Sequence, residues 1–128
     1  MATRAILVDT SLLIEYFRAK NKENTQLLKL STDYSFAIST ITVFEFLSGF
    51  KTKGEVITEY LLKSFRIVPF DYACAESAAE IFQHLKSKNR LIPPSDIFIA
   101  ASAITCGLEL ATLNLKHFKG IKNLALIV

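Results

Sequence analysis

Short apolar runs alternate with longer amphipathic segments along this chain. The run at 5–8 is continuously apolar, which is typical of a central strand buried on both faces, and 11–18 has helical spacing. Strands that alternate with helices in this way predict a parallel sheet with helices on both faces. The predicted strands are 5–8, 34–38, 66–68, 108–112 and 125–128, and the predicted helices are 11–18, a short one ending near 30, 42–50, 55–65, 71–85 and 96–105.

Length and composition fit one globular domain. The chain has 128 residues, of which 51% are hydrophobic and 21% charged, and this balance excludes a disordered or low-complexity protein. Because the sequence contains no internal repeat or linker, we expect one α/β domain at 1–128, with a central parallel sheet of four to five strands flanked by helices. The formal net charge of +3 suits an anionic partner without requiring one.

The cysteines and the apolar segments indicate the cellular compartment. Cys74 and Cys106 stand far apart in apolar sequence, without the clustering that disulfides or zinc sites need, so we expect buried, reduced thiols. Asp9 interrupts the apolar start, which argues against a secretory signal. The longest uncharged stretch, 97–108, is shorter than the roughly 20 residues that span a bilayer. These features predict a cytoplasmic protein without membrane association.

Three acidic residues lie in strongly apolar sequence. Asp9 follows the run at 5–8, Glu45 lies within 41–47, and Asp96 opens the apolar segment that follows it. A buried, unpaired carboxylate costs several kcal/mol, so each of these acids needs a partner. Taken one at a time, each fits a helix cap: Asp9 or Thr10 before 11–18, Thr42 with Glu45 as a capping box, and Ser95 with Asp96 at the next helix start.

The topology favours a joint role for the three acids. Asp9 ends the first strand, Glu45 lies shortly beyond the second, and Asp96 begins the helix that leads into the fourth. All three are therefore expected at the carboxyl edge of the sheet, where open α/β sheets place their sites. Carboxylates gathered there repel one another unless a cation is present. Oxygen ligands without cysteine or a histidine pair favour Mg²⁺ or Mn²⁺ over zinc.

Four motifs occur in series: LVDTS at 7–11, STITVFE at 39–45, PPSDIFIAA at 93–101 and TLNLKHF at 112–118. In this order and spacing they resemble the PIN domain, the nuclease fold of VapC-type toxins, and the resemblance covers essentially the whole chain. It implies a PIN-like α/β fold and a Mg²⁺- or Mn²⁺-dependent endoribonuclease that hydrolyses RNA phosphodiester bonds with metal-activated water. It also implies the toxin of a type II toxin–antitoxin pair, with a cognate VapB-like antitoxin encoded beside it.

The resemblance and the chemistry of phosphodiester hydrolysis assign roles to particular residues. Asp9 and Asp96 are expected to be primary metal ligands, and Glu45 a ligand or a base that orients water, so these three are the predicted catalytic residues. The side chains expected to hydrogen-bond the carboxylates or the water around the metal are those of Thr10, Ser11, Thr112 and Asn114.

Asn114 departs from the family pattern, because the fourth acidic position falls around this residue. An amide holds a metal more weakly than a carboxylate, so the choice between one metal and two stays open. His117 is close enough in sequence to substitute as a ligand, and a surface or phosphate-facing histidine is the alternative.

Two kinds of partner are expected from the surface chemistry. Lys116, Lys119 and Lys122 adjoin Asn114 and are the favoured RNA contacts, ahead of the basic residues at 51–53 and 86–90, although such runs are also typical of a solvated face. The helices at 42–50 and 55–65 carry more apolar residues than their own packing needs, which suggests a groove for an antitoxin segment or a homodimer surface. The residues of this apolar set are Phe44, Phe46, Leu47, Phe50, Leu61, Leu62 and Phe65.

Three alternatives fit parts of the sequence. A degenerate PIN-like domain that binds RNA or a protein partner without cleavage is suggested by Asn114. A receiver-type signalling domain needs an acid pair after the first strand, where Asp9 stands alone, and a phospho-acceptor after the third, where Asp71 is the one candidate. A phosphatase with an aspartate nucleophile needs Asp-x-Asp, and the second aspartate is missing after Asp9.

Overall fold

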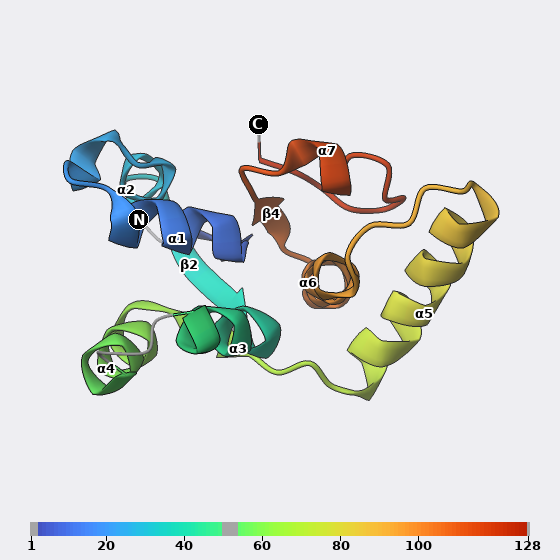
Figure 1. The fold of residues 1–128 in the computed structure, drawn as a ribbon, viewed down its shortest axis with the longest axis horizontal. Helices are drawn as coiled ribbons and strands as arrows, with labels where there is room; N and C mark the ends of the chain where they lie inside the picture. The colour runs from blue at the N-terminus through green and yellow to red at the C-terminus, as the bar shows by residue number, and fades with distance from the viewer. Residues whose placement is uncertain (1–2, 50–53, 128) are drawn as a thin grey trace.

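A four-stranded parallel sheet forms the centre of the molecule (Figure 1). The structure is a computed structural model and describes residues 3–49 and 54–127. Its strands are β1 (Arg4–Val8), β2 (Tyr34–Ser39), β3 (Arg66–Val68) and β4 (Glu109–Ala111), in the order β3-β2-β1-β4. The strand order therefore reverses between β1 and β4, and the crevice at such a reversal is where open α/β sheets place their sites. The predicted fold class is confirmed.

Helices cover both faces of the sheet, and β1 shows how its residues divide between them. Leu7 packs against the side formed by α5 and α6, whereas Ile6 and Val8 pack against the side formed by α1 to α4. This alternation follows from the geometry of a strand. The helices are α1 (Thr10–Arg18), α2 (Gln26–Leu30), α3 (Thr40–Gly49), α4 (Gly54–Ser64), α5 (Tyr72–Ser87), α6 (Pro94–Cys106) and α7 (Leu115–Phe118), with a 3₁₀ turn at Lys22–Asn24.

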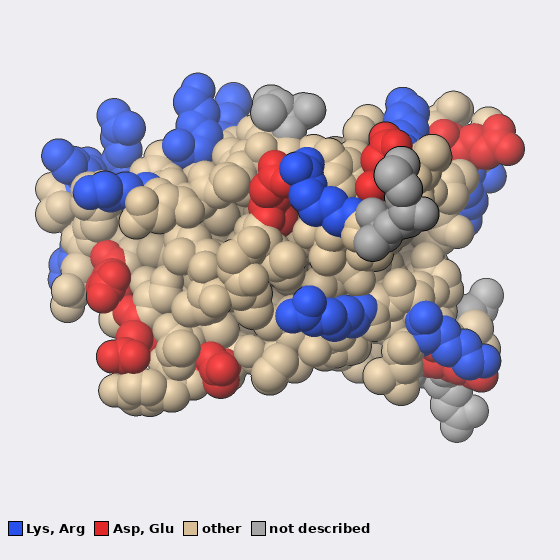
Figure 2. Space-filling view, turned by 180° about the vertical axis from the view of Figure 1, so that it is seen from behind, with Lys and Arg blue, Asp and Glu red and all other residues tan. Residues whose placement is uncertain are grey.

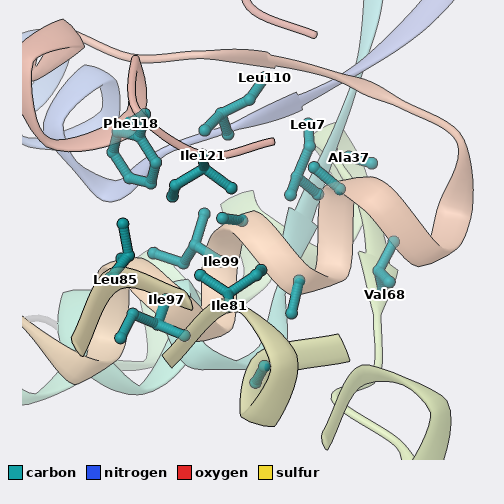
Figure 3. Packing of buried hydrophobic residues seen from close by; sticks show 14 residues of the cluster. Leu7, Ala37, Val68, Ile81, Leu85, Ile97, Ile99, Leu110, Phe118 and Ile121 are labelled. Atoms are coloured by element: carbon teal, nitrogen blue, oxygen red, sulfur yellow. The ribbon is translucent and has the colours of Figure 1, made fainter. Parts of the chain in front are cut away.

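Helix α6 lies inside the molecule, between the sheet and α5. Its residues Ile99 and Ala100 have no exposed surface, and Ile81 and Leu85 of α5 pack on the side away from the sheet (Figure 3). A helix that is apolar all round is found in such an enclosed position, because every face of it avoids water. The enclosure fixes the first turn of α6, and with it Asp96, at the carboxyl edge of the sheet.

The start of α6 differs from the prediction. The helix begins at Pro94, with Pro93 at the N-cap position, and among the described residues no side chain caps it. The predicted cap at Ser95 is therefore wrong. Proline suits the first helical position because it lacks the backbone N–H that would otherwise stay unpaired there.

Helix α3 also begins earlier than predicted, at Thr40. Its cap is the Ser39 side chain, whose Oγ accepts hydrogen bonds from the backbone N–H groups of Ile41 (2.9 Å) and Thr42 (3.4 Å). A capping box with Thr42 as the N-cap residue and Glu45 in the first turn would require the helix to start three residues later, at Val43. That interpretation is wrong, and both side chains are used elsewhere.

The last predicted strand is reduced to a single bridge. Leu126 pairs in parallel with Leu110 of β4, and residue 128 of this predicted strand lies outside the described residues. The last residue of the predicted helix 42–50 also lies outside the described residues. Two elements of fewer than five residues, the 3₁₀ turn Lys22–Asn24 and α7, were not predicted from the sequence. Elements this short have too few residues to show a hydrophobic period.

Cys74 and Cys106 are free thiols, and only the first matches its expected burial. Cys74 is buried, whereas Cys106 is exposed, so the expectation of two buried thiols is wrong for Cys106. Cys106 lies in the last turn of α6, where the helix leaves the core. None of the helices in the described part of the chain is long and apolar enough to cross a membrane.

Gly107 ends α6 in a left-handed conformation, with φ of 66°. An added Cβ at Gly107 would meet no described atom within 4 Å, so Gly107→Ala tests backbone conformation alone. We expect Gly107→Ala to lower the free energy of unfolding by about 1–2 kcal/mol, and Gly107→Asn to lower it less.

The matched control is Gly120→Ala. Gly120 has equal space around its Cα but no positive φ, so little or no loss of stability is expected. Urea unfolding of the three variants measures these differences. Equal stability of Gly107→Ala and the unsubstituted protein would contradict a conformational role for Gly107.

Candidate active site

Asp9 lies where β1 and β4 end together, at the reversal of strand order. Its backbone N–H donates to the carbonyl oxygen of Ala111 (2.9 Å), and its side chain is almost fully buried. Oδ2 of Asp9 accepts hydrogen bonds from the hydroxyls of Ser11 (2.7 Å) and Thr112 (2.8 Å). Asp9 occupies the N-cap position of α1, but none of the described side-chain contacts is a cap bond there. The carboxylate is therefore held by hydroxyls on both sides of the crevice.

The same two hydroxyls tie the loop after β4 to Asp9. Ser11 Oγ accepts from the backbone N–H of Leu113 (3.0 Å), and Thr112 Oγ1 accepts from the backbone N–H of Asn114 (2.9 Å). Each hydroxyl thus accepts from the backbone and donates to the carboxylate, which strengthens both bonds. The side chain of Asn114 is exposed at the N-cap position of α7.

Glu45 is positioned by Thr10, the first residue of α1. Thr10 Oγ1 donates to Oε1 of Glu45 (2.7 Å) and lies 3.1 Å from Oγ1 of Thr42, which is fully buried. Because Ser39 caps α3, Thr42 and Glu45 can face α1 instead of the helix end. The contact joins α1 and α3, the helices that follow β1 and β2.

Asp96 lies in the first turn of α6 and is 9% exposed. Its Oδ2 accepts a hydrogen bond from Nδ1 of His117 in α7, at 2.7 Å. Burial raises the pKa of Asp96, the hydrogen bond from His117 opposes that rise, and the negative charges of Asp9 and Glu45 add to it. The three carboxylates are thus close enough to repel one another.

The donor chemistry of this cluster fits a hard divalent cation. All three acids offer oxygen, the ligand atom that Mg²⁺ and Mn²⁺ prefer. Within 3–49 and 54–127, no three His, Cys, Asp or Glu side chains lie close enough together to hold one metal ion directly. Mg²⁺ does not require such a set, because it usually keeps several waters and binds one or two carboxylates.

The lysines predicted to contact RNA differ in their surroundings. Lys116 is next to His117 and exposed, and Lys119 is also exposed. Lys122 lines a cavity of about 290 Å³ between α5 and the C-terminal segment, beside Glu80 and His84. The basic residues at 51 and 53 lie outside the described residues.

The contact of His117 with Asp96 was not predicted from the sequence. His117 was expected to be a substitute metal ligand or a surface or phosphate-facing histidine, and in the structure it hydrogen-bonds a site carboxylate. The available signal was topological: His117 follows the last strand, so it returns to the same edge of the sheet as Asp96. A separation of 21 residues hides the pair from any local pattern.

Comparisons with known proteins agree with this geometry. Residues 6–123 match the model of the PIN domain family. The chain is 36% identical over 122 residues to Ribonuclease VapC1 of Methanocaldococcus jannaschii, covering 94% of this chain and 84% of that protein. It resembles VapBC2 from Rickettsia felis bound to a DNA fragment from their promoter, with a TM-score of 0.80, 27% identity, and 96% and 97% of the two chains covered. It also resembles a toxin–antitoxin complex from Klebsiella pneumoniae, with a TM-score of 0.74, 32% identity, and 94% and 95% covered.

The fold and the site together define an α/β protein with an acidic site at the point where the order of a parallel sheet reverses. Asp9, Glu45 and Asp96 lie around that point, and each is held by a side chain from another element. The chain belongs to the PIN domain family. The resemblance drawn from the four sequence motifs is confirmed.

The raised pKa of Asp96 makes its ionised form unfavourable in the folded protein. The folded chain then binds this proton more tightly than the unfolded chain, so the carboxylate lowers stability as the pH rises from about 4 through the raised pKa. We expect Asp96→Asn to change metal-free stability little in acid and to raise it by on the order of 1 kcal/mol at pH 7.

The control is Asp71→Asn, because Asp71 caps α5 and the backbone N–H of Cys74 lowers the pKa of Asp71. Its charge stabilises the fold above the unfolded pKa, and this contribution disappears as the pH falls through the lowered value. Asp71→Asn should therefore show the opposite sign at pH 7. Urea unfolding in EDTA across a pH series measures both variants. A loss of stability in both at pH 7 would mean that Asp96 acts as an ordinary first-turn acid.

Proposed function

We propose that this protein is a Mg²⁺- or Mn²⁺-dependent endoribonuclease and the toxin of a toxin–antitoxin pair. The observation that carries the proposal is that Asp9, Glu45 and Asp96 lie around the reversal of strand order, close enough for the charges of Asp9 and Glu45 to act on Asp96. The names of the relatives support the coarser part of it, a PIN nuclease of a toxin–antitoxin system. The metal, the RNA substrate and the assignment of residues rest on the chemistry of the site.

Asp9 and Asp96 are the residues that would hold the cation. A bound Mg²⁺ or Mn²⁺ supplies Lewis acidity, which lowers the pKa of water and neutralises charge on the phosphoryl oxygens. Asp9 keeps Oδ1 for this purpose because Ser11 and Thr112 both bind Oδ2. Asp96 likewise keeps Oδ1, since His117 binds Oδ2.

Glu45 is suited to handle a proton. Thr10 holds Oε1 of Glu45, which leaves Oε2 to orient the attacking water and to accept its proton. The water then attacks phosphorus opposite the 3′ oxygen, the bond between phosphorus and that oxygen breaks, and the leaving oxygen takes a proton from Glu45 or from solvent. The hydroxyls of Thr10, Ser11 and Thr112 keep the carboxylates in place during this step.

RNA is expected to approach over α7. Lys116 and Lys119 are exposed on either side of His117, which touches the acidic site. Figure 2 shows Lys and Arg side chains gathered along the upper left, the half of the molecule that holds α7 and α5 in the upper right of Figure 1. Positive charge beside an acidic site can hold the phosphate backbone on either side of the bond to be cut.

A PIN-like domain that binds RNA or a protein partner without cleavage is the second candidate. Asn114 favours it, because this exposed amide stands where the family's fourth acidic residue is expected. A metal-titrated cleavage assay separates the two functions.

The purified protein with Mg²⁺ or Mn²⁺ should cleave a subset of cellular RNA, and EDTA should stop the cleavage. Asp9→Asn and Asp96→Asn should each lower the rate by about a hundredfold or more, because metal stabilisation of the transition state is worth several kcal/mol. Asp33→Asn, at an exposed turn, is the matched control and should keep full activity. Unchanged cleavage by both site variants would refute the site assignment, and RNA binding without cleavage by the unsubstituted protein would favour the second candidate.

The exposed apolar residues of α3 and α4 are the proposed docking surface for the antitoxin. Phe44, Val56 and Leu62 are each more than 60% exposed. The other members of the predicted apolar set are not exposed in this way. Leu47 is partly buried, and the core contains Phe46, Leu61 and Phe65. Phe50 lies outside the described residues. An amphipathic segment could cover the exposed residues, and a basic side chain on it could reach the acids. A homodimer is the other proposed use of this surface.

Antitoxin binding should depend on this surface. Phe44→Asp and Leu62→Asp should each weaken the complex with the product of the neighbouring reading frame by about tenfold or more, because exposed apolar anchors carry much of an interface's energy. Tyr72→Asp, at an equally exposed aromatic residue on α5, is the control and should leave affinity unchanged. Titration calorimetry with the purified partner measures the effect, and size-exclusion of the toxin alone tests the homodimer. Equal affinities for all three variants would contradict this surface.

A further inference from the structure

His117 is the described side chain that hydrogen-bonds Asp96, and no hydroxyl takes its place there. Asp9 and Glu45 are held by hydroxyls from α1 and from the end of β4. Asp96, at the start of a helix without a side-chain cap among the described residues, depends on a residue from α7 instead. The side chain of Asp96 is 12% exposed and that of His117 is 43% exposed. The contact therefore lies at the boundary between core and solvent.

The backbone of α7 holds His117 firmly at this place. The next residue, Phe118, has no exposed surface and packs beside α6 in the core (Figure 3). The backbone N–H of His117 donates to the carbonyl oxygen of Asn114 (3.0 Å). With Phe118 buried and Lys116 exposed, the imidazole is confined to the face of α7 that meets Asp96.

One hydrogen bond from Nδ1 decides which oxygen of Asp96 is available. Because Nδ1–H donates to Oδ2, rotation of the carboxylate is restricted and Oδ1 is the oxygen left for another ligand. Residues that hydrogen-bond a metal ligand orient it, and their loss commonly costs about 10–100-fold in metal affinity. The bond also favours the ionised carboxylate against burial and the neighbouring acids.

We propose that His117 is a positioning residue for the cation site, holding Oδ2 of Asp96 so that Oδ1 faces the metal. The inference rests on the proposed metal-dependent function and assigns His117 neither a metal contact nor an RNA contact. This role differs from a purely structural one in two ways. A substitution at His117 must change metal affinity, and the size of the change must depend on whether the new side chain places a nitrogen atom where Nδ1 lies. Asparagine places its amide nitrogen about where Nδ1 of histidine lies, whereas glutamine extends to the region of Nε2.

The test is Mn²⁺ binding to the full chain without RNA, measured by titration calorimetry. His117→Ala should weaken Mn²⁺ binding by about 10–100-fold. His117→Asn should bind close to the unsubstituted protein, and His117→Gln should behave like His117→Ala. The matched control is His84→Ala, which removes the chain's other histidine, exposed on α5, and should leave Mn²⁺ affinity unchanged.

Cleavage assays provide the second readout. The Mg²⁺ concentration for half-maximal cleavage should rise in His117→Ala and His117→Gln, while the rate at saturating Mg²⁺ stays near that of the unsubstituted protein. Full Mn²⁺ affinity in His117→Ala, or equal behaviour of the Asn and Gln variants, would overturn the proposal. So would a loss of saturated rate at unchanged metal affinity, because it would place His117 on the RNA. If His117→Ala does not fold, the comparison of Asn with Gln still decides the matter.

The proposed function fails in a different way. If the unsubstituted protein and Asp96→Asn bind Mn²⁺ equally weakly, there is no cation site at these acids, whatever His117 does. If the unsubstituted protein binds Mn²⁺ and Asp96→Asn does not, the site stands and the His117 variants test the positioning role alone.

Discussion

The burial of α6 between the sheet and α5 is the constraint on which the site depends. Because Ile99 and Ala100 are enclosed on all sides, the helix cannot shift to bring Asp96 into water without opening the core. The carboxylate is therefore kept near Asp9 and Glu45, and burial together with their charge raises the pKa of Asp96. The protein thus tolerates a locally unfavourable charge because the surrounding apolar packing outweighs it.

The hydroxyl donors that hold Asp9 and Glu45 preserve the negative charge of the site. Hydroxyls of Thr10, Ser11 and Thr112 orient Asp9 and Glu45 without adding positive charge. Lysine and arginine would neutralise the cluster, and the ion pairs that they form in the described residues, Arg4–Glu109 and Lys63–Glu59, lie elsewhere. A cation that enters the crevice would therefore meet acids that are already positioned and, among the described residues, not paired with lysine or arginine, which favours binding of a hard metal.

The sequence predicts an element or a site residue correctly where the pattern within a single segment is enough to identify it. The apolar run at 5–8 predicts a central strand, and a central strand that ends in Asp9 predicts an acid at the carboxyl edge. Contacts between segments were not visible, because the pair of Asp96 with His117 depends on how α7 packs against α6.

Choices between similar neighbouring residues were also hidden in the sequence. Ser39 caps α3 although Thr42 has capping-box spacing with Glu45, because two polar residues three positions apart compete to set where the helix starts. The sequence likewise does not show that Phe44 is exposed and Phe46 buried, because the rotation of α3 against the sheet decides which of the two faces inward.

Helix α3 connects the two proposed activities, because Phe44 and Glu45 are consecutive residues on it. Phe44 belongs to the proposed antitoxin surface, and the side chain of Glu45 reaches the acidic site through Thr10. A partner that covers Phe44 would therefore contact the helix that also carries Glu45. A basic side chain from such a partner would be attracted by the same acids that would hold the metal. On this arrangement, metal and antitoxin compete for one charge, and inhibition needs no long-range conformational change.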